Sequence, residues 1–98
     1  MIRSTGTLTS PKASQYLQQL CKHFAHKVEV SFDAHQGHVT LGSGPVALAA
    51  TEHRLAITVT APDLAALPQA RQVIDKHLAI FAHREGFTTL DWDEPVEA

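Results

Sequence analysis

Histidine is the residue type in this chain whose number and placement could support chemistry. The 98 residues include seven histidines. Neutral imidazole is the commonest protein ligand for transition metals, and its charge changes close to neutral pH. Two segments of the sequence are predicted to form helices. Three of the seven histidines lie on the flanks of these segments, and they are His23, His26 and His77. A metal or haem-iron site built by these three rings is therefore the first hypothesis.

Two predicted helices must position these rings. The first begins with Ser10 as N-cap and Pro11 at the first helical position, and apolar residues then recur at helical spacing through Ala13, Tyr16, Leu17, Leu20, Cys21 and Phe24. At about 100° per residue, His23 lies about 60° from Leu20, on the flank of the apolar face. His26 follows three residues later and is expected on the same flank.

The second predicted helix runs from Pro68 to about Arg84, after a short turn from Asp63, and Gly86 ends it. His77 lies on the flank of its apolar face, one turn before Phe81. If the two helices pack side by side, the three rings approach one another.

A second interpretation of the three histidines needs no ligand: amphipathic rings can cover the line of contact between two helices. No His-x-x-x-His pair is present, and no carboxylate shares the flank with His23. Arg84, seven residues after His77 on the same flank, is a candidate anion-binding residue, or simply a cation at the end of a helix.

The remaining candidate residues are predicted to pack in the core or to lie on the surface, without a chemical role. Cys21 and His23 are about 200° apart on a regular helix, so one metal ion cannot contact both. Cys21 lies in the middle of the apolar face, where a buried thiol behaves as a small hydrophobic side chain. His35, His38 and His53 fall on or beside expected hairpin turns and are predicted to lie on the surface.

Between the helices the apolar pattern changes to a period of two, which indicates strands. Turn residues separate the segments, and expected strands lie at residues 5–9, 28–32, 38–41, 46–50, 55–60 and 88–93. The predicted order is β-α-β-β-β-β-α-β. Hairpins between two helices predict an α+β, two-layer sandwich, with an antiparallel-rich sheet and both helices on one face.

Composition limits the class of protein. Residues 1–98 are expected to form one domain, with residues 94–98 as a short acidic tail. Residues 1–54 carry five Lys/Arg and three Asp/Glu, a net +2, and residues 55–98 carry three and seven, a net −4. The polar sheet face, rich in Thr and carboxylates, disfavours nucleic-acid binding. The absence of an apolar run of about 20 residues predicts no membrane span, and one cysteine without a signal segment favours the cytoplasm.

The segment from Tyr16 to Lys27 (YLQQLCKHFAHK) resembles a bacterial family known as domain of unknown function 2218. The resemblance continues through Val28-Glu29-Val30, the turn at residues 42–44, and HLAIFAHRE at residues 77–85. It implies a small bacterial protein with no established activity. Some relatives are joined to, or encoded near, siderophore-interacting flavin reductases and iron-uptake proteins, which implies an iron connection.

Three functional hypotheses follow. The leading one is an accessory protein that binds iron, haem or a ferric chelate, or alternatively zinc, through His23, His26 and His77, with Arg84 nearby. A siderophore-interacting reductase or another iron-uptake protein is its expected partner. The first alternative is a non-catalytic homodimer, paired through an edge strand or the polar sheet face. The second is a small acid–base enzyme with His23 as base and Arg84 holding an anionic substrate, which requires a ligand-sized pocket.

Overall fold

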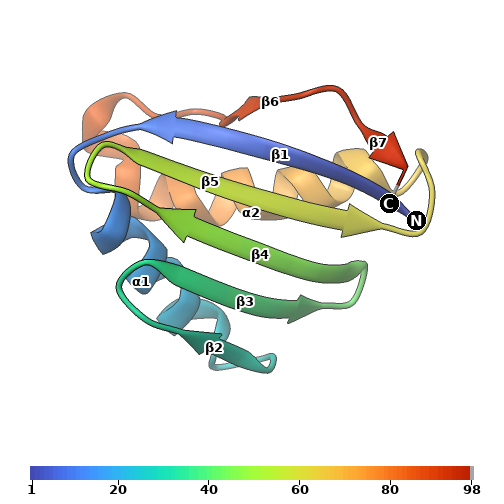
Figure 1. Cartoon of the computed structure of the whole chain (residues 1–98), viewed down its shortest axis with the longest axis horizontal. Helices are drawn as coiled ribbons and strands as arrows, with labels where there is room; N and C mark the ends of the chain where they lie inside the picture. The colour runs from blue at the N-terminus through green and yellow to red at the C-terminus, as the bar shows by residue number, and fades with distance from the viewer. Residues whose placement is uncertain (98) are drawn as a thin grey trace.

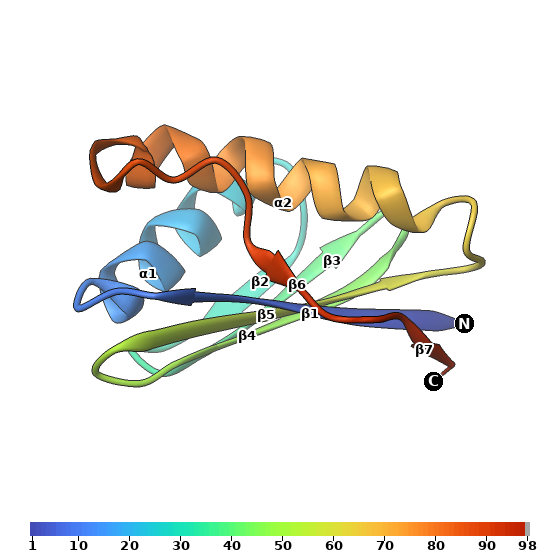
Figure 2. The ribbon, with the colours of Figure 1, turned by 90° about the horizontal axis from the view of Figure 1, so that it is seen from above.

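The chain builds a single antiparallel sheet with both helices on one of its faces, as Figures 1 and 2 show for the computed structural model, which describes residues 1–97. The elements are β1 (Ile2–Thr9), α1 (Ala13–Phe24), β2 (Val30–Phe32), β3 (Gln36–Leu41), β4 (Gly44–Ala50), β5 (Arg54–Ala61), α2 (Leu67–Ala82), the 3-10 helix η1 (His83–Glu85), β6 (Asp91–Trp92) and β7 (Val96–Glu97). This confirms the predicted α+β sandwich and the predicted order of strands and helices through β6; η1 and β7 are additional. Within residues 1–97, no helix combines the length and apolar character required to cross a membrane.

The sheet order is β2-β3-β4-β5-β1-β6, with β7 also pairing with β1. The first strand is therefore internal: β5 lies along one side of β1, and the two short C-terminal strands lie along the other. Figure 1 shows the red C-terminal segment running beside blue β1. The expected closing strand at 88–93 is only two residues long, and residues 96–97, which the sequence assigns to a tail, form β7.

The core lies between the sheet and the helices because alternate strand residues face the helix layer. The inward side chains of β3, β4 and β5 are almost fully buried: Val39, Val46, Leu48, Ala50, Leu55, Ile57, Val59 and Ala61. The apolar face of α1 packs on them with all six residues that its period predicts. Burying one such leucine is worth about 2–3 kcal/mol, so this layer fixes α1 on the sheet.

A polar contact also joins the region where α1 begins to η1, which follows α2. Ser10 Oγ donates to the carboxylate of Glu85, at 3.0 Å from Oε1 and 3.1 Å from Oε2, and the Tyr16 hydroxyl donates to the same carboxylate. Ser10 Oγ also accepts from the backbone N–H of Lys12 at 3.0 Å, so it closes the turn before α1 although Lys12 is the N-cap residue. Burial and the Glu85 contact raise the pKa of Tyr16 to about 12, which keeps its hydroxyl a donor.

Asp75 on α2 holds the C-terminal segment. Its carboxylate accepts from Thr89 Oγ1 at 2.6 Å, from the Leu90 backbone N–H at 2.9 Å and from Trp92 Nε1 at 3.0 Å. One turn earlier, Arg71 Nη2 donates to Ser4 Oγ at 2.8 Å and to the Asp93 carbonyl at 2.9 Å. These contacts join α2, the helix that carries His77, to β1 and the C-terminal segment.

Candidate functional site

His23 and His77 meet where the end of α1 crosses α2. Their ring centroids are 5.0 Å apart and the ring planes are inclined by 48°. Both side chains are partly buried. The structure therefore brings together two of the three histidines that the sequence placed on facing helix flanks.

Two phenylalanines enclose the pair. The Phe24 centroid lies 5.8 Å from that of His23 and 5.1 Å from that of His77, and Phe81 presents its ring to His23 at 6.0 Å. Phe24 belongs to the buried core, whereas Phe81 is partly buried. We call His23, His77, Phe24 and Phe81 the histidine seam. Its aromatic walls shield one side of the imidazole pair from water.

The hydrogen bond of His77 fixes its tautomer. Its Nδ1 lies 2.6 Å from the carbonyl oxygen of Val73, one turn earlier on α2. A carbonyl oxygen only accepts, so Nδ1 carries the proton and Nε2 of the neutral ring keeps a free lone pair. Metal-ligating histidines commonly have this arrangement, with the second ring nitrogen donating to a carbonyl or carboxylate.

His23 is held in its neutral form. Burial lowers the pKa of His23 below its ordinary value of 6.5, and the nearby His77, His26 and Lys27 lower it further. Near neutral pH, its ring therefore has one nitrogen lone pair for a metal ion or a proton.

Gln19 is a polar residue of this region that sequence reasoning missed. Its Oε1 is buried and has no hydrogen-bond partner within residues 1–97. Gln19 lies one turn before His23, and residues at this spacing are neighbours on the same side of a helix. A buried amide oxygen without a partner costs about 1–3 kcal/mol. Its spacing from His23 was the available signal.

His26 does not continue the helical flank. The helix ends at Phe24, and residues 25–27 form a turn in which the Lys27 and Val28 N–H groups both donate to the Phe24 carbonyl. His26 is therefore exposed, because the 100° step on which its expected position rested no longer applies. Arg84 is likewise exposed, in η1. Among the described residues, no three His, Cys, Asp or Glu side chains gather as a group able to hold a metal ion.

The other histidines lie at the surface. His35, His38 and His53 are exposed, as their turn positions predict. His83 is also exposed, with its Nδ1 3.1 Å from the Ile80 carbonyl. The seam is thus the place where imidazoles are enclosed.

Cys21 faces the sheet rather than the seam. It is fully buried, and a Cβ added to Gly37 of β3 would lie 2.8 Å from its Sγ. Burial raises the pKa of the Cys21 thiol from 9.0 to about 11. This confirms a packed thiol and leaves no nucleophile at this position.

We therefore expect the Cys21 thiol of the native protein to resist modification. At about pH 8 the raised pKa reduces the thiolate fraction about a hundredfold, and burial blocks access as well. The test is the rate of release of a coloured thiol from an aromatic disulfide reagent, in buffer and in concentrated guanidinium chloride. The unfolded chain should react at once and the native chain at less than about 1% of that rate. Equal rates would show that Cys21 is accessible.

Comparisons with known proteins agree with this architecture. Residues 5–93 match the family described as uncharacterized protein conserved in bacteria (DUF2218). The NMR structure of PA4090 from Pseudomonas aeruginosa is similar, with 29% sequence identity and a TM-score of 0.76, over 95% of this chain and 96% of that one. No curated protein matches the chain. With nearly its whole length covered, the chain belongs to the DUF2218 family of uncharacterised bacterial proteins.

Proposed function

We propose that this protein is a small accessory domain that binds a transition metal, iron above all, through His23 and His77 while a small chelator holds the metal's other coordination positions. The observation that carries the proposal is the imidazole pair, with ring centroids 5.0 Å apart.

This separation suits two neighbouring positions on one metal ion. A nitrogen–metal bond of about 2.1 Å places the ring centroid about 3.2 Å from the metal. Two such rings would have centroids about 5.2 Å apart at a tetrahedral angle and about 4.5 Å apart at a right angle. The separation of 5.0 Å lies between these values. The ring separation is therefore compatible with two histidine ligands on one ion.

The same arithmetic disfavours a haem held by both rings. Axial ligands on opposite sides of a haem iron would place the two centroids about 6.4 Å apart, with the porphyrin plane between them. At 5.0 Å the rings leave no space for that plane. A metal with two open neighbouring positions is therefore a better fit than haem with two histidine ligands.

The two histidines would contribute to metal binding in different ways. His77 would bind through Nε2, because Nδ1 donates to the Val73 carbonyl and holds the ring in place. Burial lowers the pKa of His23, which favours the neutral ring that a metal ion requires.

A metal that arrives already partly coordinated explains why two protein ligands would suffice. The family's iron context, which the sequence resemblance implies, makes a ferric or ferrous chelate the favoured ligand. A siderophore-interacting reductase of iron uptake is the partner that we propose. The acid–base alternative has less support, because the hollow between α2 and the β3–β4 turn is lined by none of His23, His77 and Arg84.

The proposal predicts binding of a chelate with two adjacent open positions. Nickel(II) nitrilotriacetate and iron(III) nitrilotriacetate have this geometry and are suitable probes for isothermal titration of untagged protein. We expect one chelate per chain. His23→Ala and His77→Ala should each weaken binding roughly tenfold or more, since a lost ligand costs at least as much as a lost outer-shell partner.

A matched control uses exposed histidines. The His38→Ala/His53→Ala double variant removes two rings outside the seam and should bind the chelate with unchanged affinity. Unchanged binding after the loss of both His23 and His77 would refute the proposal. Equal weakening in the control variant would do the same, because it would show unspecific binding by surface imidazoles.

A further inference from the structure

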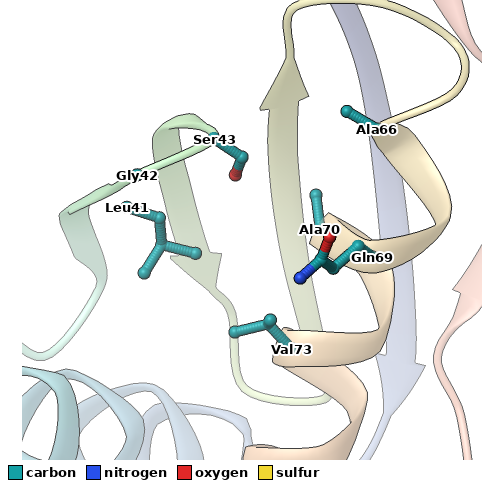
Figure 3. Close-up of a pocket in the computed structure, with 7 residues that line it drawn as sticks. All are labelled: Leu41, Gly42, Ser43, Ala66, Gln69, Ala70 and Val73. Carbon is teal, nitrogen blue, oxygen red and sulfur yellow. The ribbon is translucent and has the colours of Figure 1, made fainter.

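A hollow opens between the β3–β4 turn and the first turns of α2, drawn in Figure 3. Its volume is about 390 Å³, within the range of sites for small molecules. The turn contributes Leu41, Gly42 and Ser43 on one side. The helix contributes Ala66, Gln69, Ala70 and Val73 on the other. No function described above uses this hollow.

Small residues keep the hollow open. Gly42 has no side chain, and a Cβ built there would meet nothing within 4 Å. Ala66 and Ala70 present only methyl groups from α2, and Figure 3 shows both on the side that faces the turn. Leu41 and Val73 supply larger apolar walls at the inner end. The lining is thus mainly apolar and has room for a ring-sized group.

Two polar side chains face each other across the hollow. In Figure 3 the Ser43 hydroxyl and the Gln69 amide point toward the space between turn and helix. Ser43 is half-buried and Gln69 is exposed, so a ligand in the hollow can reach both groups. The hydroxyl and the amide each donate and accept, so they match a ligand's amide or hydroxyl group.

The charge of the ligand follows from the lining. None of the lining residues is ionisable. A charged molecule would lose hydration on entering and would find no opposite charge, which is unfavourable. The lining therefore selects a neutral molecule.

We propose that this hollow binds a small neutral molecule with an apolar body and one amide or hydroxyl group. The apolar body lies on Ala66, Ala70, Leu41 and Val73, and the polar group bonds to Ser43 and Gln69. This site is distinct from the histidine seam. Val73 lies next to both: its side chain lines the hollow, and its carbonyl accepts from His77 of the seam.

The test is a titration with benzamide followed through the backbone amide signals of the 15N-labelled chain. We expect saturable shifts at Gly42, Ser43, Gln69 and Val73, with a dissociation constant on the order of 1 mM, as suits a fragment of this size. Benzoate, of the same shape but charged, should bind at least about tenfold more weakly. Binding of benzoate as tight as that of benzamide would overturn the selection of a neutral ligand.

Variants locate the binding. Gln69→Trp fills the hollow and should abolish the shifts, whereas Gln72→Trp on the exposed side of the same helix should leave them unchanged. Ser43→Ala removes one polar group and should weaken binding several-fold, which gives an independent result on the turn side. The amide spectrum itself reports whether each variant is folded. The absence of saturable shifts at the hollow, or equal weakening in Gln72→Trp, would overturn the proposal.

Discussion

Replacing Gly6 with alanine is expected to lower the free energy of unfolding by about 3 kcal/mol, although the change adds a single methyl group. Gly6 pairs with Ile57 of β5 on one side and with Trp92 of β6 on the other. A Cβ there would lie 2.8 Å from Leu90 Cβ and 2.8 Å from Trp92 Cε3. Both neighbours belong to the C-terminal segment that packs over β1, so the methyl group would force that segment away from the sheet.

Urea unfolding followed by circular dichroism measures this effect. Gly42→Ala is the matched control, because nothing lies within 4 Å of the added Cβ. Its free energy of unfolding should stay within about 0.5 kcal/mol of the parent value, as for an ordinary surface substitution. A Gly6→Ala variant as stable as Gly42→Ala would mean that the C-terminal segment does not cover Gly6 in solution.

Replacing Asp75 with alanine is expected to cost about 3 kcal/mol by a different route. The carboxylate accepts three hydrogen bonds from the C-terminal segment, including those from the Leu90 backbone and the Trp92 indole. Alanine offers no acceptor, so these donors must find water or remain unpaired. We expect the C-terminal segment to detach from α2 before the remaining sheet unfolds.

Trp92 is the single tryptophan of the chain, so its fluorescence reports on this segment directly. In the Asp75→Ala variant the emission should shift to longer wavelength at lower urea concentration than the loss of circular dichroism. Asp91→Ala, an exposed change on the same segment, should leave the two transitions coincident. If Asp75→Ala also unfolds in one step with parental stability, the carboxylate does not hold the segment.

The central part of the fold could be predicted because its signals are local and repeated. Alternation of apolar and polar residues marks β3, β4 and β5. The apolar period of α1 identifies all the residues of that helix that the structure buries. Pro68 near the start of α2 and Gly86, with a positive φ of 77° after η1, lie where the sequence predicts them. Each of these features depends on a few neighbouring residues.

The C-terminal strands could not be predicted with equal accuracy because backbone pairing with a distant partner creates them. Ile2 and Arg3 of β1 pair with Glu97 and Val96, nearly the whole chain apart, and two residues carry no period. Their position depends on the free side of β1, which the chain order alone does not reveal.

The candidate site could be predicted only where its residues lie on a regular helix. His23 and His77 lie on regular helices, so the helical period places them on facing flanks. His26 follows Phe24, where α1 ends without a glycine or proline to mark the stop. Gln19 was not anticipated because the helical period marks the buried face by its apolar residues, and an amide gives no such signal.

The edges of the sheet have a consequence for the behaviour of the protein in concentrated solution. One edge is β2, with three residues, and the other is divided between β6 and β7, with two residues each. Such short strands offer another chain only a few free N–H and C=O groups, and Pro95 interrupts the segment between β6 and β7. The long strands β1, β4 and β5 are each paired on both sides. Within residues 1–97, the fold therefore exposes no long strand edge, and aggregation into fibres depends on such an edge.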